Sequence, residues 1–153
     1  MNKLTSDSEL RSLWFQCGSQ RFAVPMSHLR EVIPVTSLRK VPMTEPALAG
    51  FMDLRDQVIP VFNPRALVSA DAPDFSLPAV VIVVSLHDQE SLGLLADRIG
   101  RVVQTPPPRP LDPAVRSPAS FLGQTTTDDN TESLLVDVPG MANAFGLKTA
   151  VAA

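Results

Sequence analysis

The chain has 153 residues, of which 44% are hydrophobic and 19% are charged, as in a globular protein of one domain. Its net charge of −3 and its lack of a basic cluster argue against a nucleic-acid groove. The longest aliphatic run, Ala79 to Val84, is far shorter than the ~20 residues of a membrane span, so we expect no direct membrane insertion. We expect no signal peptide, because the first residues contain no apolar segment. The single cysteine excludes an internal disulfide and fits a reducing cytoplasm, and the 15 prolines favour strands and turns over long helices.

The first part of the chain predicts a hairpin followed by single strands. Residues 10–17 and 21–24 are apolar stretches separated by the turn signal Gly18-Ser19-Gln20. Pro25 ends the second strand, and residues 26–29 have room for one helical turn. Residues 29–35 predict another strand, and residues 38–42 predict a short edge strand.

The stretch from Gly50 to Arg65, GFMDLRDQVIPVFNPR, predicts a second hairpin. Two apolar sets flank a polar middle, and we expect Asp56 and Gln57 to form the loop, because Asp tolerates turn conformations. Arg55 then stands beside a turn, where its five donors suit carboxylates. The alternative is that Arg55 is an ordinary solvated turn residue.

The second half of the chain predicts further strands after a polar connector at residues 69–78. The run AVVIVV at residues 79–84 lacks alternation, which is typical of a strand buried on both faces. Residues 92–96 and 97–104 predict strands, and the proline-rich residues 105–118 predict an extended loop. Residues 124–131 and 134–137 predict a closing hairpin. A short helix is expected within residues 138–147, interrupted by Pro139-Gly140.

The sequence provides little support for catalysis or metal binding. Ser27 and His28 are neighbours that point apart, and no strained nucleophile motif such as G-x-S-x-G is present. The histidines and Cys17 lack the spacing of a metal site, and no phosphate-binding glycine motif occurs. We therefore expect no catalytic residues, no metal and no cofactor.

Four blocks of the sequence resemble the CheW-like family of chemosensory adaptors. Gly50 to Arg65 is similar to the family pattern G-V-x-N-L-R-G-x-x-x-P-V-x-D-L-R, with departures at Asp56, Asn63 and Pro64. Upstream, Leu29-Arg30-Glu31-Val32-Ile33 and Val41-Pro42 resemble the family's V-x-E-V-I and V-P motifs. Downstream, residues 92–102 (LGLLADRIGRV) resemble V-G-L-x-V-D-x-V-x-x-V.

This resemblance implies a mainly β fold, in which two small five-stranded SH3-like β-barrel subdomains pack on a shared core with short helices. We expect a flexible N-terminus at residues 1–11, a single CheW-like domain at residues 12–145 and a short tail at residues 146–153. The first barrel would comprise about residues 22–78 plus the C-terminal segment. The second would comprise about residues 79–135 with the N-terminal strand.

The resemblance also implies a non-catalytic coupling protein, not an enzyme, that bridges the cytoplasmic tips of methyl-accepting chemoreceptors and a CheA-type histidine kinase. Other CheW-like domains are a further candidate partner, and the expected location is the cytoplasm, at membrane-bound receptor arrays. The expected receptor-binding groove contains Leu29, Glu31, Gly50, Arg55, Gly93, Asp97 and Val102. The expected kinase-binding residues are Met43, Leu48, Phe51 and Val58.

Within the groove, the resemblance gives Gly93 the role of admitting a receptor helix. It gives Arg55 a carboxylate partner, either Glu31 or Asp97 of this chain or a group of the receptor. Plain core packing is the alternative for the apolar positions.

Three alternatives to this function remain at the level of sequence. The chain is an adaptor for a second, non-flagellar chemosensory system that governs pili or surface behaviour, or it binds only one of the two partners. The third alternative is a small hydrolase that uses Ser27 and His28 or Asp97, and it requires Asp97, Arg55 and His28 to converge in one pocket.

Overall fold

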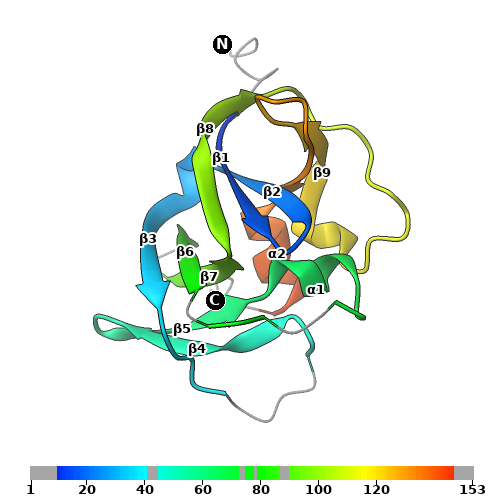
Figure 1. The fold of residues 1–153 in the computed structure, drawn as a ribbon. Helices are drawn as coiled ribbons and strands as arrows, with labels where there is room; N and C mark the ends of the chain where they lie inside the picture. The colour runs from blue at the N-terminus through cyan, green and yellow to red at the C-terminus, as the bar shows by residue number, and fades with distance from the viewer. Residues whose placement is uncertain (1–9, 41–44, 73–74, 78, 87–89, 147–153) are drawn as a thin grey trace.

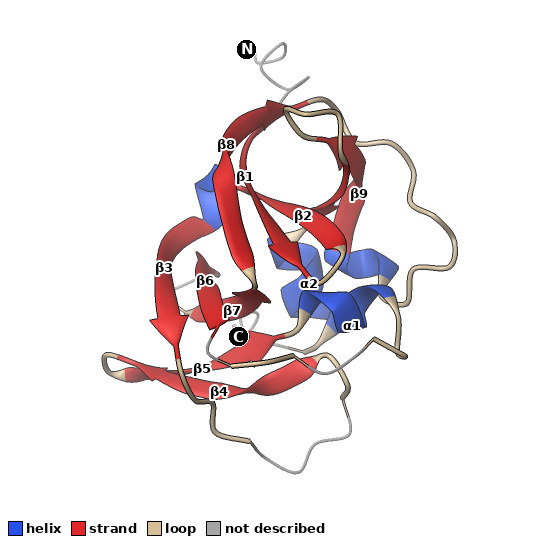
Figure 2. Ribbon diagram, viewed as in Figure 1, coloured by secondary structure: helices blue, strands red, loops and turns tan. Residues whose placement is uncertain are grey.

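A computed structural model describes residues 10–40, 45–72, 75–77, 79–86 and 90–146, and strands dominate it (Figures 1 and 2). The strands are β1 (Leu10–Cys17), β2 (Gln20–Pro25), β3 (Leu29–Val35), β4 (Leu48–Leu54), β5 (Gln57–Phe62), β6 (Ala79–Ser85), β7 (Ser91–Ala96), β8 (Arg98–Thr105), β9 (Phe121–Thr126) and β10 (Glu132–Val136). The short helices are α1 (Pro64–Val68) and α2 (Val138–Ala144), and the single 3-10 turns are η2 (Met26–His28) and η3 (Pro118–Ser120).

Two five-stranded sheets make up the fold, as the family resemblance implies. Sheet 1 has the order β8-β1-β2-β10-β9, and sheet 2 has the order β3-β6-β7-β5-β4. The division of the chain differs from the predicted barrels, however. Strand β2 belongs to sheet 1, and β6 and β7 belong to sheet 2. Sheet 2 is therefore built from residues 29–96, whereas sheet 1 combines the two ends of the described chain.

The pairing of distant strands explains this correction. Strand β7 lies between β6 and β5 and pairs in parallel with β5, so it joins the β6–β7 hairpin to the β4–β5 hairpin in sheet 2. Strand β2 lies between β1 and β10, pairing in parallel with β10. Neither parallel pair has a local sequence signal, because the paired residues are about 30 or more positions apart along the chain.

The two sheets repeat one connection pattern. In sheet 2, edge strand β3 leads through a loop to the β4–β5 hairpin and α1, followed by the β6–β7 hairpin. In sheet 1, edge strand β8 leads through a loop to the β9–β10 hairpin and α2, and the β1–β2 hairpin takes the place of β6–β7. Each loop makes one isolated bridge to the following strand, Arg39 with Phe51 and Arg109 with Gln124. Residue 39 is all that the structure shows of the edge strand expected at residues 38–42, and residues 41 and 42 lie outside the described residues.

A shared apolar core holds the two sheets together. It includes Phe15 and Phe22 of sheet 1 and Ile82 and Leu94 of sheet 2, all fully buried, with Met141 of α2 beside them. Alternate residues of β6 face opposite ways. Ile82 and Val84 enter the shared core, and Val81 and Val83 enter a separate cluster inside sheet 2. This arrangement confirms that the aliphatic run is a strand buried on both faces.

Each α-helix has a capping side chain at its N-terminus and a proline in its first turn. Asn63 caps α1 by accepting a hydrogen bond from the backbone N–H of Arg65, and Pro64 occupies the first helical position, where its missing donor costs nothing. Asp137 caps α2 in the same way through Gly140. The prediction that Pro139-Gly140 interrupts this helix was wrong. Pro139 lies in the first turn of α2, where proline is tolerated, and the helix continues to Ala144.

Candidate functional site

The turn between β4 and β5 consists of Arg55 and Asp56. Gln57 already belongs to β5 and pairs with Leu54, so the predicted loop was one residue too far along the chain. The backbone of Arg55 has a φ of 55°, in the left-handed region that is uncommon for residues other than glycine. Among the described residues only Arg55 and Asn130 share this feature without being glycine. The left-handed backbone conformation is at Arg55 and not at Asp56. Asp56 occupies the position at which the family pattern has glycine, and its backbone here does not require a glycine.

Arg55 forms a two-pronged ion pair with Glu31 of β3. The distances are 2.6 Å from Nη1 to Oε2 and 3.1 Å from Nη2 to Oε1. Hydrogen bonding from the guanidinium lowers the pKa of Glu31 below its usual value, and the same bond raises the pKa of Arg55. Glu31 lies in β3, Arg55 lies in the turn that follows β4, and β3 and β4 are the two edges of sheet 2, so this ion pair links the two edges. The arginine side chain stays 64% exposed, whereas that of Glu31 is 26% exposed.

Asp97, the other predicted partner of Arg55, lies elsewhere. Its carboxylate accepts a hydrogen bond from the backbone N–H of Gly18, and its own N–H donates to the carbonyl of Gln16. It therefore fixes the β1–β2 turn of sheet 1. His28 lies in η2 and accepts a bond from Ser85 through its backbone carbonyl. The described contacts of Asp97, Arg55 and His28 share no residue, so the convergence that a hydrolase requires is not found among them.

The two predicted apolar groove positions, Leu29 and Val102, lie on the edge strands β3 and β8. We name these two residues, together with Val32 and Ile99 of the same strands, the seam. Leu29 and Ile99 are partly buried and pack against the shared core. Val32 pairs with core residue Ile82, and Val102 pairs with core residue Leu13, yet they are 39% and 38% exposed. Residues directly opposite in a sheet share a face, so both valines stand at the open rim of the shared core. Val102 was predicted from the sequence. Val32 was not, although both are apolar residues on edge strands.

The two predicted glycines have structural reasons other than a helix approaching from outside. A Cβ on Gly93 would lie 2.6 Å from Cγ1 of Val81 and 3.2 Å from Cγ2 of Val61, so this glycine lets two buried valines close over the strand. Gly50 has a φ of 156°, and a Cβ there would lie 2.8 Å from the carbonyl oxygen of Arg39. Both glycines are buried within sheet 2, which corrects the expectation that Gly93 faces a partner.

The predicted kinase-binding residues are divided between the outside and the inside of the β4–β5 hairpin. Phe51 is opposite Pro60 and Val58 is opposite Asp53, so Phe51 and Val58 belong to one outer face, with Val58 57% exposed. Leu48 packs against the shared core instead. Met43 lies outside the described residues. A hollow of about 330 Å³ adjoins this face, between the end of β3 and β4, with Phe51 in its wall.

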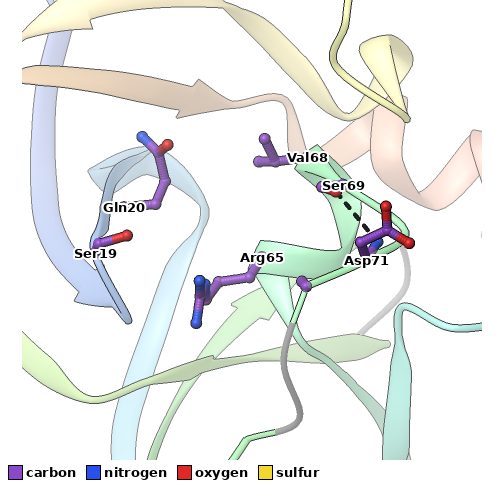
Figure 3. Close-up of a pocket in the computed structure, with 7 residues that line it drawn as sticks. Ser19, Gln20, Arg65, Val68, Ser69 and Asp71 are labelled. Carbon is purple, nitrogen blue, oxygen red and sulfur yellow. Dashed lines mark hydrogen bonds between the residues drawn. The ribbon is translucent and has the colours of Figure 1, made fainter.

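A second hollow, of about 230 Å³, lies between the β1–β2 turn and α1 (Figure 3). Ser19 and Gln20 line one side, and Arg65, Ser69 and Asp71 are among the residues of the other. The guanidinium of Arg65 covers Gly18 so closely that a Cβ there would lie 2.4 Å from Nη1. Hydrogen bonding inside the hollow is local, since the hydroxyl of Ser69 accepts from the N–H of Asp71.

The described residues include no group of three or more His, Cys, Asp or Glu side chains arranged to hold a metal ion. Cys17 is buried and donates to the amide oxygen of Asn63 over 3.7 Å. Burial raises the pKa of this thiol to about 12, so it stays protonated and unreactive near neutral pH. No helix in the described part of the chain is long and apolar enough to span a membrane.

Comparisons with known proteins agree with this arrangement. A family model described as "CheW-like domain" matches residues 11–145. The chemotaxis protein CheW of Treponema pallidum (strain Nichols) is 26% identical over 114 residues, which cover 67% of this chain and 66% of that protein. The scaffolding protein TtCheW of Thermoanaerobacter tengcongensis has a similar fold, with a TM-score of 0.68 at 21% sequence identity. That similarity covers 84% of this chain and 88% of the other.

Proposed function

Because the chain belongs to the CheW-like domain family, a family of non-catalytic chemotaxis scaffold proteins, we propose that it couples methyl-accepting chemoreceptors to a CheA-type histidine kinase. In this proposal the receptor's cytoplasmic tip binds beside the seam and Arg55, and the kinase binds the outer face of the β4–β5 hairpin. The protein then acts in the cytoplasm at receptor arrays, without inserting into the membrane.

The observation that carries the proposal is the exposed arginine on a strained turn. A residue other than glycine in the left-handed region costs free energy, and such strain concentrates at functional positions. The guanidinium holds Glu31 with two donors, and 64% of the Arg55 side chain stays exposed, so a partner can reach its remaining donors. A carboxylate of a partner is the group that such a fork binds best.

The outer face of the β4–β5 hairpin supports the second half of the proposal. Val58 is the most exposed large hydrophobic residue of the described chain, and Phe51 is on the same face beside the hollow of about 330 Å³. An apolar side chain next to a hollow is a common anchor in protein interfaces. This face lies on the other side of β4 from the buried Met52 and Leu54, so a partner can cover it without disturbing the core.

The test measures binding of the purified chain to a receptor cytoplasmic fragment and, separately, to the kinase of the same organism. Arg55→Ala and Arg55→Gly both remove the guanidinium, and each should weaken receptor binding about tenfold or more, the usual loss for a charge-assisted hydrogen bond. Only the glycine variant also relieves the backbone strain, so it should melt at the same temperature as the wild type or higher. Val58→Lys should weaken kinase binding alone.

Arg109→Ala is the matched control, because Arg109 is also a partly exposed arginine with a carboxylate partner, Glu132. It should bind both partners like the wild type. If the wild type binds neither partner, coupling is not its function. Repeating the assay with receptors of a flagellar and of a second chemosensory system distinguishes these two roles.

A further inference from the structure

The edge strand of sheet 1 repeats the edge strand of sheet 2 residue by residue. In β3, Leu29 pairs with Val84 and Val32 with Ile82, so three steps on the edge strand match two on its neighbour. In β8, Ile99 pairs with Phe15 and Val102 with Leu13, with the same extra residue. Each edge strand therefore has a bulge at the same place. The pattern makes Arg101, which precedes Val102, the counterpart of Glu31, which precedes Val32.

Arg101 also has the counterpart of the Glu31–Arg55 ion pair. It contacts Asp128, which lies in the turn between β9 and β10, and the distance from Nε to Oδ2 is 2.6 Å. The β9–β10 turn corresponds to the β4–β5 turn in the repeated topology. It also contains the other residue with a left-handed backbone that is not glycine, Asn130, with a φ of 63°. Each sheet thus has an ion pair from its edge strand to its far hairpin.

In sheet 2 the acid of the pair is on the edge strand and the arginine is in the turn, whereas in sheet 1 the arginine is on the edge strand and the acid is in the turn. In both pairs the arginine is the more exposed member. The arginine side chains are 64% exposed at Arg55 and 74% at Arg101, whereas their carboxylate partners are 26% and 25% exposed. The Arg109–Glu132 pair of sheet 1 differs, because there the carboxylate is 60% exposed and the arginine 48%. Each repeated pair therefore presents a guanidinium to the outside, and in each edge strand the residue after the member of the pair, Val32 or Val102, is an exposed valine.

We propose that Arg101 forms a second contact for the receptor, equivalent to Arg55, so that the receptor's tip carries acidic groups toward both arginines. This inference rests on the proposed function and extends it to sheet 1. The occupant is an acidic receptor segment with apolar side chains between its carboxylates. Those side chains meet Val32 and Val102 at the seam, and its charge complements the two arginines.

The experiment measures binding of the receptor cytoplasmic fragment to Arg101→Glu, with Arg109→Glu as the matched charge reversal on the same sheet. Arg101→Glu should weaken receptor binding about tenfold or more and leave kinase binding unchanged, whereas Arg109→Glu should change neither. The loss should shrink as salt rises, because the arginine is exposed.

A second variant separates recognition from a structural role. Asp128→Asn breaks the same ion pair but keeps the guanidinium, so receptor binding should equal or exceed that of the wild type. Equal losses for Asp128→Asn and Arg101→Glu, with equal drops in melting temperature, would assign the pair to the fold and overturn the inference. Wild-type binding by Arg101→Glu, together with weak binding by Arg55→Ala, would also overturn it and leave the proposed function in place. If the wild type does not bind the receptor, both fail.

Discussion

Replacing Ile82 with alanine should test the shared core that joins the two sheets. Ile82 is fully buried, opposite Val32 and Leu94 in its sheet, and its side chain belongs to the cluster that contains Phe15 and Phe22. The change removes three carbon atoms at about 0.8 kcal/mol each, or about 2.4 kcal/mol of transfer free energy. The cavity that remains raises the loss to about 3–4 kcal/mol, within the usual range for this substitution.

The assay is thermal and urea unfolding of the purified chain. At about 2–4 °C per kcal/mol for a protein of this size, the melting temperature should fall by roughly 10 °C. Val32→Ala is the control, because it removes two carbons from the neighbouring strand at a position that is 39% exposed, and it should cost only about 1 kcal/mol. Equal losses for the two variants would refute the assignment of Ile82 to the shared core. Ile82→Asp, which buries an unpaired charge, should abolish the unfolding transition.

Two further predictions concern ionisable groups. Burial raises the pKa of Cys17 to about 12, so the neutral thiol favours the fold. The stability that it contributes is complete below about pH 9 and is lost as the pH rises toward 12. Native protein at pH 8 should therefore resist iodoacetamide, while urea-unfolded protein reacts, and rapid native labelling would contradict the burial. Hydrogen bonding from Thr131, and then Arg21, lowers the pKa of Asp129 to about 2. Its contribution is complete above about pH 4 and is lost as the pH falls toward 2. Asp129→Asn should flatten the dependence of the urea midpoint on pH in that window, and an unchanged slope would exclude this role.

Local patterns in the sequence predict most strands but not the sheets to which they belong. Gly18-Ser19-Gln20 marks the first hairpin, and the run at residues 79–84 predicts a strand buried on both faces, because these signals depend on neighbouring residues. The membership of β2 and β7 depends on parallel pairs with β10 and β5, which no local signal encodes. For this reason the predicted barrels divide the chain in the wrong places.

The candidate site shows the same division between local and distant information. The motif around Arg55 predicts a turn arginine with a carboxylate partner, and the structure selects Glu31, 24 residues away. Nothing in the sequence pairs Arg101 with Asp128. Arg101 occupies an unspecified position of the block at residues 92–102, and Asp128 lies outside the blocks. The role of Gly93 was missed for a related reason. Its neighbours Val81 and Val61 come from two other strands, so the tight packing appears only after the sheet forms.

The division of the sheets has a consequence for synthesis on the ribosome. Sheet 2 comes from one continuous stretch, residues 29–96, so all its strands leave the ribosome together. The β1–β2 hairpin emerges first, yet its sheet is completed last, since β8 and β10 lie on either side of it. Before β8 and Phe121 emerge, the face of sheet 2 that forms the shared core is the surface available to cover Phe15 and Phe22. The chain order therefore favours early packing of the β1–β2 hairpin on nascent sheet 2, before the other strands of sheet 1 are made.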